Sequence, residues 1–182
     1  MIMDSKEFSI LSKSFFSKPL DLEIYKTLNL KQSEQQSFVR KHLKKNLGID
    51  IKLGEMLKLA EGSVSISHCN AAVGYAHSTN DFVGFDIEET KRITPKLIAR
   101  IAKHSEIDLF VFEHLIWSIK EASFKALMCA NQPQTISEIN IVHAIAHEGY
   151  LEFEVEYKNQ KLSGIAAKLQ SPETDVALAM LI

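Results

Sequence analysis

The stretch EHLIWSIKEASFKALM, residues 113–128, combines the apolar spacing of a buried helix with charges in its middle. Residues four apart lie on the same face of an α-helix, so Trp117, Glu121 and Lys125 share one stripe. A second, apolar stripe consists of Leu115, Ile119, Ala122 and Ala126. We expect a helix over residues 108–129 whose carboxylate and ammonium find partners inside the fold, because unpaired buried charges are costly.

The bulk composition is that of a globular protein. A chain of 182 residues suffices for one domain or two small subdomains that share a core. The N-terminus lacks the basic and apolar regions of a signal peptide, and the most apolar run, around residues 109–119, is too short and too charged to span a bilayer. Cys69 and Cys129 form no disulfide framework, which fits a reducing compartment. We expect a soluble, cytoplasmic protein with neither a membrane nor a nucleic-acid partner.

Positive charge is concentrated near the N-terminus. Residues 1–60 carry 11 Lys and Arg against 7 Asp and Glu, whereas residues 61–182 carry 10 against 16. The positive segment peaks at RKHLKK, residues 40–45. Such a cluster can bind phosphate groups, although a solvated helix face is the simpler interpretation of this run on its own.

The remaining patterns predict helices and mainly antiparallel strands, which is the α+β class. A helix is expected over residues 30–50, with Gly48 at its end, and a second helix with Thr94 as N-cap and Pro95 at its first position. Strict alternation in LEFEVEY, residues 151–157, is typical of a half-buried strand. Further strands are expected in 63–78 (a hairpin turning near Asn70), 82–89, 162–170 and 175–182.

Two carboxylates in the strand 82–89 suggest a cation site. Asp86 and Glu88 are two residues apart, so both side chains project from one face of the strand, where their charges repel unless a cation lies between them. With Glu121 as a third oxygen donor, the set suits Mg²⁺, and Lys125 could neutralise a phosphate held by the metal. A plain Glu121–Lys125 ion pair would satisfy the helix charges equally well.

These segments resemble the motifs of a known family. VGFDIEE (83–89) followed by WSIKEASFKAL (117–127) resembles G-x-D-x-E and W-x-x-K-E-x-x-x-K, the two signature motifs of the 4'-phosphopantetheinyl transferases. SISHC (65–69) resembles the family's Ser-His strand, and VRKHLKKNL (39–47) is similar to its early Arg-containing helix. The resemblance spans residues 38–127 and is closer to the larger, Sfp-type branch than to the short trimeric carrier-protein synthases.

The resemblance implies a fold and a reaction. Members of the family pair two similar α+β halves about a pseudo-twofold, here expected as residues 1–78 and 79–182, with coenzyme A in the cleft between them. They transfer the 4'-phosphopantetheine arm of coenzyme A to a serine of an acyl or peptidyl carrier protein and release adenosine 3',5'-bisphosphate. A chain with its own cleft is expected to act as a monomer.

The resemblance also implies catalytic and metal-binding residues. Asp86, Glu88 and Glu121 would hold Mg²⁺ on the pyrophosphate of coenzyme A, and Asp86 would belong to the coenzyme A site as well. Lys125 would neutralise charge on the transferred phosphoryl group. Glu121, or a water on the metal, would accept the proton of the carrier serine, and Trp117 would pack to fix the helix.

The other implied contacts are to coenzyme A. Ser67 and His68 would contact its phosphates, and Arg40, together with Lys44, its 3'-phosphate. Lys120 is included among the coenzyme A contacts, although it points about 100° away from Glu121 around the helix.

Two alternative functions stay open at this stage. One is a non-catalytic relative that binds a carrier protein or coenzyme A. The other is an unrelated Mg²⁺-dependent phosphohydrolase in which Asp86 and Glu88 activate water, which leaves the motif WSIKEASFKA unexplained. His143 and His147, four residues apart, are not expected to bind a metal, because their surroundings predict a strand and a turn rather than a helix.

Overall fold

The structure is a computed structural model that describes residues 3–27, 30–50, 59, 62–109, 113–128, 131–170 and 173–181, with only the backbone of Gln32. In chain order its elements are α1 (Ser5–Phe16), β1 (Leu20–Lys26), α2 (Gln32–Leu47), β2 (Ser63–His68), β3 (Ala72–Ser78), β4 (Val83–Glu89), η1 (Thr90–Arg92), α3 (Pro95–Ile101), α4 (His104–Ile107), α5 (Leu115–Leu127), η2 (Ile136–Glu138), β5 (Asn140–Ala146), β6 (Leu151–Tyr157), β7 (Gln160–Leu169) and β8 (Thr174–Leu181). The predicted α+β class is confirmed.

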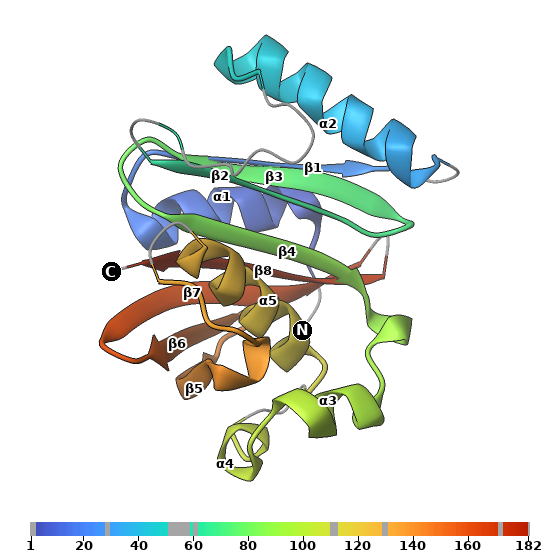
Figure 1. The fold of residues 1–182 in the computed structure, drawn as a ribbon. Helices are drawn as coiled ribbons and strands as arrows, with labels where there is room; N and C mark the ends of the chain where they lie inside the picture. The colour runs from blue at the N-terminus through green and yellow to red at the C-terminus, as the bar shows by residue number, and fades with distance from the viewer. Residues whose placement is uncertain are drawn as a thin grey trace.

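The strands form two antiparallel sheets. One has three strands in the order β1-β3-β2, and the other has five in the order β4-β8-β7-β6-β5. Helix α2 covers the outer face of the smaller sheet, and α5 packs on β4, β8 and β7 of the larger one (Figure 1). Helix α1 contacts strands of both sheets, β1 and β7. No helix in the described part of the chain is long and apolar enough to cross a membrane.

A ladder of serine side chains joins the two sheets at the edge strands β2 and β4, and we call this junction the seam. The Oγ atoms of Ser63, Ser65 and Ser67 accept hydrogen bonds from the backbone N–H groups of Val83 (2.8 Å), Phe85 (2.8 Å) and Ile87 (3.2 Å). Successive rungs advance by two residues on both strands, so β2 and β4 run in the same direction. The serines satisfy N–H groups on the edge of β4 that would otherwise be buried without partners.

Most of the elements that the sequence predicts are present, and the residues expected to begin or end helices do so. Gly48 ends α2 in the left-handed conformation at φ 70°. The Oγ1 of Thr94 accepts a hydrogen bond from the Leu97 N–H at 3.2 Å, which caps α3 ahead of Pro95. The expected strand over 151–157 has the alternating burial that its sequence predicts.

The prediction for the long helix was wrong at its start. Helix α5 begins at Leu115 rather than at residue 108, because the chain first forms the short helix α4 and then a turn at Asp108 and Leu109. A continuous apolar run has no periodicity that separates a helix from the segment leading into it. The expected end at Cys129 lies outside the described residues.

The first two elements, α1 and β1, were not predicted from the sequence. Helix α1 begins with a capping box in which Asp4 accepts from the Glu7 N–H and Glu7 accepts from the Asp4 N–H, both at 2.8 Å. Strand β1 alternates in LDLEIYK and pairs with β3. Both signals are present in the printed sequence.

One hydrophobic cluster unites the two predicted segments. It includes Phe8, Leu22 and Ala76 from residues 1–78, and Phe85 and Leu178 from residues 79–182. The chain changes sheets between β3 and β4, near the expected boundary, but the two segments share this core. Their status as separate domains related by a pseudo-twofold stays a prediction.

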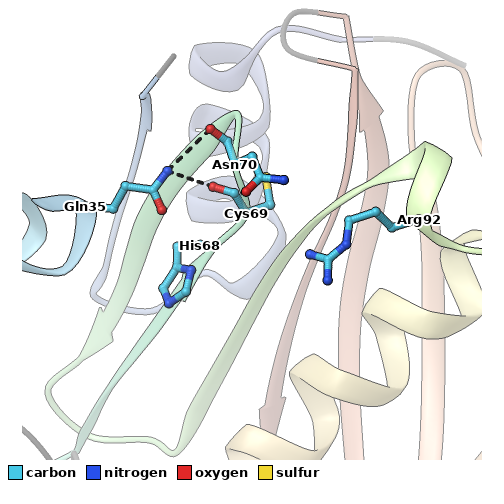
Figure 2. A pocket seen from close by; sticks show the side chains of 5 residues that line it. All are labelled: Gln35, His68, Cys69, Asn70 and Arg92. Atoms are coloured by element: carbon cyan, nitrogen blue, oxygen red, sulfur yellow. Dashed lines mark hydrogen bonds between the residues drawn. The ribbon is translucent and has the colours of Figure 1, made fainter. Parts of the chain in front are cut away.

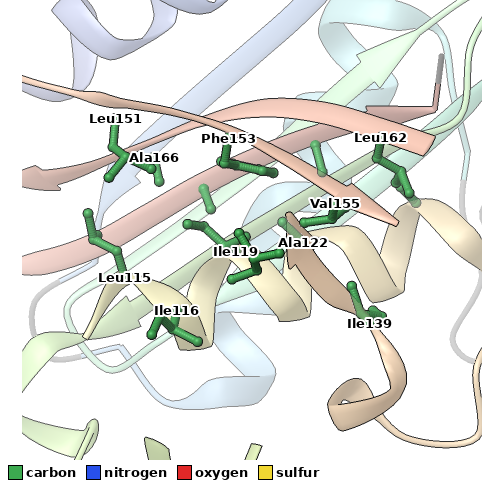
Figure 3. Close-up of a cluster of buried hydrophobic side chains, with 14 of the residues drawn as sticks. Leu115, Ile116, Ile119, Ala122, Ile139, Leu151, Phe153, Val155, Leu162 and Ala166 are labelled. Atoms are coloured by element: carbon green, nitrogen blue, oxygen red, sulfur yellow. The ribbon is translucent and has the colours of Figure 1, made fainter. Parts of the chain in front are cut away.

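A second cluster anchors the helix that carries the charged stripe. The apolar side chains Leu115, Ile119 and Ala122 of α5 belong to one buried cluster with Phe153 and Val155 of β6 (Figure 3). Burial of this stripe fixes the rotation of the helix about its axis, because the apolar positions face the sheet. The stripe of Glu121 and Lys125 then points toward the seam.

Candidate functional site

Three side chains from three elements meet at the seam. The Nζ of Lys125 donates to Asp86 Oδ1 at 2.8 Å, to Ser67 Oγ at 3.1 Å and to the carbonyl oxygen of Phe85 at 3.1 Å. Ser67 in turn donates to Asp86 Oδ1 at 3.0 Å. An ion pair of Lys125 with Glu121 was the alternative that the sequence left open; in the described residues Lys125 pairs with Asp86 instead. Residues from the predicted Ser-His strand, Asp-x-Glu strand and Lys-Glu helix therefore form one hydrogen-bonded cluster.

Gly84 brings α5 close enough to β4 for this contact. A Cβ built on Gly84 would lie 1.8 Å from the carbonyl oxygen of Ala122 and 2.5 Å from the N of Ala126, both backbone atoms of α5. Any larger residue would push the helix away from the strand. The glycine that precedes Asp86 by two positions thus sets the distance between Asp86 and Lys125.

The carboxylate of Asp86 is only partly satisfied. Both interactions with Lys125 and Ser67 use Oδ1, whereas Oδ2 is buried and has no hydrogen-bond partner among the described residues. A buried carboxylate oxygen without a donor costs free energy. Its presence at a cluster of charged groups indicates a place where a ligand can bind.

Glu88, on the same face of β4, is held by two donors. Its Oε1 accepts from the Glu89 N–H at 2.8 Å and from Arg92 Nη1 at 3.0 Å. Burial raises the pKa of Glu88 above its ordinary value; the Glu89 N–H and Arg92 oppose that shift, while the charge of Asp86 adds to it. Glu88 is therefore a carboxylate whose charge is disfavoured by burial, an effect that the exposed Arg92 only partly offsets.

Glu121 has the least support of the three carboxylates. Among the described residues no hydrogen bond or ion pair reaches its side chain, which is half-buried. Burial raises the pKa of Glu121, the charges of Asp86 and Glu88 raise it further, and the charge of Lys125 lowers it. Three carboxylates around one lysine give the site a local excess of negative charge, and the carboxylates repel one another.

His68 borders a pocket beside this cluster. The pocket has a volume of about 440 Å³ and is lined by Gln35, His68, Cys69, Asn70 and Arg92 (Figure 2). Burial and the nearby charge of Lys125 lower the pKa of His68, which favours the neutral imidazole. The volume falls in the range of small-molecule sites.

Gln35, which was not among the predicted site residues, fixes one wall of the pocket. Its buried side-chain amide donates to the carbonyl oxygens of Cys69 (2.9 Å) and Asn70 (3.4 Å) and to Thr27 Oγ1 (2.9 Å). These bonds tie α2 to the turn between β2 and β3. The one available signal was its position in the helix, four residues before Val39 on the buried side.

The structure places Arg40 and Lys44 elsewhere on α2. Neither lines the pocket of Gln35 and His68. Arg40 is half-buried, and the exposed Lys44 Nζ lies 2.5 Å from Asp50 Oδ2 in a surface ion pair. Their expected contact with a 3'-phosphate stays a prediction.

Lys120 is not part of the site, which corrects its inclusion among the coenzyme A contacts. Its side chain is 0% exposed, and its Nζ donates to Glu106 Oε1 at 2.9 Å and to the carbonyl oxygen of Ile139 at 2.7 Å. The roughly 140° that separate positions 120 and 125 around a helix point the two lysines to different neighbours. Lys120 therefore joins α5 to α4 and to the segment before β5.

The donor set fits Mg²⁺ in chemistry and charge. Within the described residues, no three His, Cys, Asp or Glu side chains are gathered closely enough to share one ion. Besides burial, the charge of Asp86 raises the pKa of both Glu88 and Glu121, and Asp86 Oδ2 lacks a donor among the described residues. Oxygen ligands of this kind suit a hard cation, and side-chain rotation would have to bring them together.

A fourth carboxylate, Asp175, lies on the same face of the larger sheet as Glu88 and was not predicted from the sequence. Asp175 of β8 lies opposite Glu88 in the strand register, so both side chains project from the same face of the sheet. It is fully buried, lies 2.9 Å from His114 Nδ1 through Oδ1 and accepts a hydrogen bond from Thr90 Oγ1 at 3.1 Å. Strand pairing alone reveals this neighbour, because 87 positions separate the two residues in the chain.

No protein-family model and no curated protein sequence matches the chain. A function is therefore inferred from the geometry of the site and from the sequence motifs.

Proposed function

We propose that the protein transfers the 4'-phosphopantetheine arm of coenzyme A to a serine of an acyl or peptidyl carrier protein. The observation that carries the proposal is the contact of Lys125 with both Asp86 and Ser67. Three sequence motifs that resemble those of 4'-phosphopantetheinyl transferases thereby converge on one point, although they are separated in the chain. A pocket of suitable size adjoins that point.

Asp86, Glu88 and Glu121 are the residues that would hold Mg²⁺ in this reaction. A bound Mg²⁺ supplies neutralisation of charge on the pyrophosphate of coenzyme A. The three carboxylates supply negative charge that attracts a divalent cation; burial, with the charge of Asp86 adding to it, raises the pKa of Glu88 and Glu121, so a bound cation would relieve the cost of their charged forms.

Lys125 would act on the transferred phosphoryl group. Its side chain is 23% exposed, and its ammonium lies at the seam in contact with three oxygen atoms of the protein. A fixed positive charge in a partly buried site stabilises developing negative charge more strongly than one in water does. Phosphoryl transfer depends mainly on such positioning and charge stabilisation.

Glu121 is the protein group best suited to accept the proton of the attacking serine. The hydroxyl oxygen of the carrier serine forms a bond to the phosphorus of the phosphopantetheine arm, and the bond from that phosphorus to the adenosine bisphosphate breaks. Its raised pKa makes Glu121 a stronger base than an exposed glutamate. The released product is adenosine 3',5'-bisphosphate.

The pocket lined by Gln35, His68 and Arg92 would receive the nucleotide portion of coenzyme A. The basic residues of α2, among them Arg40 and Lys44, would favour acidic ligands nearby through long-range attraction. We expect the protein to act as a monomer in the cytoplasm.

Intact-protein mass spectrometry tests the proposal. An apo acyl carrier protein is incubated with the protein, coenzyme A and Mg²⁺, with EDTA in a parallel reaction. The expected result is a gain of one phosphopantetheine mass on the carrier that EDTA abolishes. Release of inorganic phosphate from simple phosphate esters, with the carrier unchanged, would instead indicate a phosphohydrolase.

A non-catalytic relative that binds coenzyme A or a carrier is the second candidate. The observation that favours it is the internal pairing of Asp86 with Lys125 and of Glu88 with Arg92, which leaves the described carboxylates apart from one another. Calorimetric binding of coenzyme A without any mass gain on several carriers would support this candidate and exclude the transferase.

A further inference from the structure

We propose that Arg92 exchanges partners when the site is loaded. It pairs with Glu88 while no divalent cation is bound, and it turns to an anionic group of the ligand in the pocket once a cation takes Glu88. This inference rests on the proposed function and adds to it a positioning residue that couples metal binding to nucleotide binding.

Arg92 contacts Glu88 and also lines the pocket, so both proposed partners are within its reach. Its Nη1 lies 3.0 Å from Glu88 Oε1, in a pair where the side chains are 57% and 17% exposed. The same guanidinium lines the pocket, where it faces Gln35 and His68 across the opening (Figure 2). A side chain this exposed can move without unpacking the core.

The pairing with Glu88 is the one that a divalent cation would disturb. Glu88 Oε1 accepts from both Arg92 and the Glu89 N–H. A divalent cation bound to this carboxylate repels the guanidinium and competes for the same oxygen lone pairs. The Glu89 N–H belongs to the backbone and stays in place, so Arg92 is the donor that leaves.

A displaced guanidinium has a natural partner in a phosphate. Arginine stays charged at all relevant pH values and presents five N–H donors in a planar fork that matches phosphate oxygens. The pocket also offers the side chains of His68 and Asn70, and it adjoins the cluster of Lys125. Its chemistry therefore fits a nucleotide phosphate.

The neighbouring cations are committed to other contacts. Lys125 has three protein acceptors at the seam. Lys91 pairs with the buried Glu89 at 2.7 Å, and Glu89 also accepts from the Asn70 N–H of the pocket turn at 3.2 Å. Among the described residues, Arg92 is the cation that both pairs with a proposed metal ligand and lines the pocket.

The exchange makes metal and nucleotide binding cooperative. Without metal, Arg92 lines the pocket, but its guanidinium is held by Glu88 and is less available to a bound ligand. With metal, the guanidinium is released toward the ligand, so each ligand raises the affinity for the other by the same factor.

Isothermal titration calorimetry on the full chain tests this coupling with Mg²⁺ alone and with adenosine 3',5'-bisphosphate in the presence and absence of Mg²⁺. The variant is Arg92→Gln, and the control is Lys91→Gln, which removes the same charge one residue away. In Arg92→Gln we expect Mg²⁺ to bind about two- to fivefold more tightly than in the control, because an exposed ion pair no longer competes. The nucleotide should bind roughly tenfold or more weakly in the presence of Mg²⁺, because a charge-assisted contact is lost.

The expected result is that Arg92→Gln binds Mg²⁺ more tightly and the nucleotide more weakly, whereas Lys91→Gln shows neither change. If Arg92→Gln and Lys91→Gln behave alike while the wild-type chain binds both ligands, the exchange is excluded and the proposed function stands. If the wild-type chain binds neither Mg²⁺ nor the nucleotide, the exchange and the proposed function both fail.

Discussion

Helix α5 carries two lysine–carboxylate pairs in very different surroundings. Lys120 and Glu106 are 0% and 2% exposed, whereas Lys125 and Asp86 at the seam are 23% and 8% exposed. Glu106 uses both oxygens: Oε1 accepts from Lys120 and the Ile141 N–H, and Oε2 accepts from the Lys103 N–H at 2.6 Å. Asp86 uses Oδ1 alone and leaves Oδ2 without a partner.

The difference separates a structural charge from one that is available to a ligand. The Lys120 ammonium has two protein acceptors, Glu106 Oε1 and the carbonyl oxygen of Ile139, and solvent does not reach it. Lys125 sits where a carboxylate oxygen is unsatisfied and a pocket begins. By burial alone, Lys120 would be the more unusual of the two lysines. The carboxylate oxygen without a hydrogen-bond donor lies beside Lys125, and it marks Lys125 as the lysine available to a ligand.

The largest effect is expected from Lys120→Met. Removal of the ammonium leaves the Glu106 carboxylate buried without its counter-charge, which should lower the free energy of unfolding by about 3–5 kcal/mol. Urea denaturation followed by circular dichroism measures the loss. The double variant Lys120→Met/Glu106→Gln should recover part of it, since glutamine removes the charge but keeps an acceptor for the Ile141 N–H. A change below about 1 kcal/mol in the single variant would contradict the structural role.

Lys125→Met should affect activity rather than folding. We expect the rate of holo-carrier formation to fall by about 10²–10³-fold, the typical cost of removing one electrostatic contact to a transition state. The loss in unfolding free energy should be smaller than for Lys120→Met, because solvent and Ser67 remain available to Asp86. Single-turnover assays and urea denaturation on the same preparations separate the two effects. Lys125→Arg, which keeps the charge, should restore part of the rate.

Ser67→Ala and Ser63→Ala form a matched pair along the seam. Each leaves a buried N–H of β4 without an acceptor, so each should cost about 1–3 kcal/mol of stability. Ser67→Ala alone also loosens Lys125 and Asp86, so it should weaken the binding of coenzyme A about tenfold, whereas Ser63→Ala should not. Calorimetric titration with coenzyme A and Mg²⁺ gives the comparison. Equal affinities in the two variants would remove Ser67 from the site.

The smallest effect is expected in the stability of Glu121→Gln. The native pKa of Glu121 lies above its unfolded value, so the native state binds its proton more tightly, and wild-type stability falls as pH rises between those two values. The glutamine variant lacks this loss of stability and should melt at a higher temperature than wild type at neutral pH. The expected shift is about 2–4 °C for each 1 kcal/mol of difference in the free energy of unfolding. Thermal denaturation from about pH 4 to pH 8 measures how the melting temperature of each protein, wild type and variant, depends on pH. The same variant should lose activity and the stabilisation of the protein by Mg²⁺. Parallel pH profiles for the two proteins would contradict the raised pKa that burial and the neighbouring carboxylates give Glu121.

The sequence determined those features whose causes lie within one element. The two-residue period of a strand puts Asp86 and Glu88 on one face, and the spacing of a helix puts Glu121 and Lys125 on one stripe. Caps at Thr94 and Gly48 are local hydrogen-bonding choices and were predictable for that reason. The capping box of α1 was equally local and could have been found.

The tertiary structure alone decided which charges meet. The pairing of Lys120 with Glu106, of Lys125 with Asp86 rather than Glu121, and of Asp175 opposite Glu88 all depend on contacts between distant elements. Such contacts are set by strand register, by the serine ladder of the seam and by the close approach of α5 at Gly84. The periodicity of a sequence fixes the face on which a side chain lies, but packing between elements fixes what that face touches, because the partners come from segments far away in the chain.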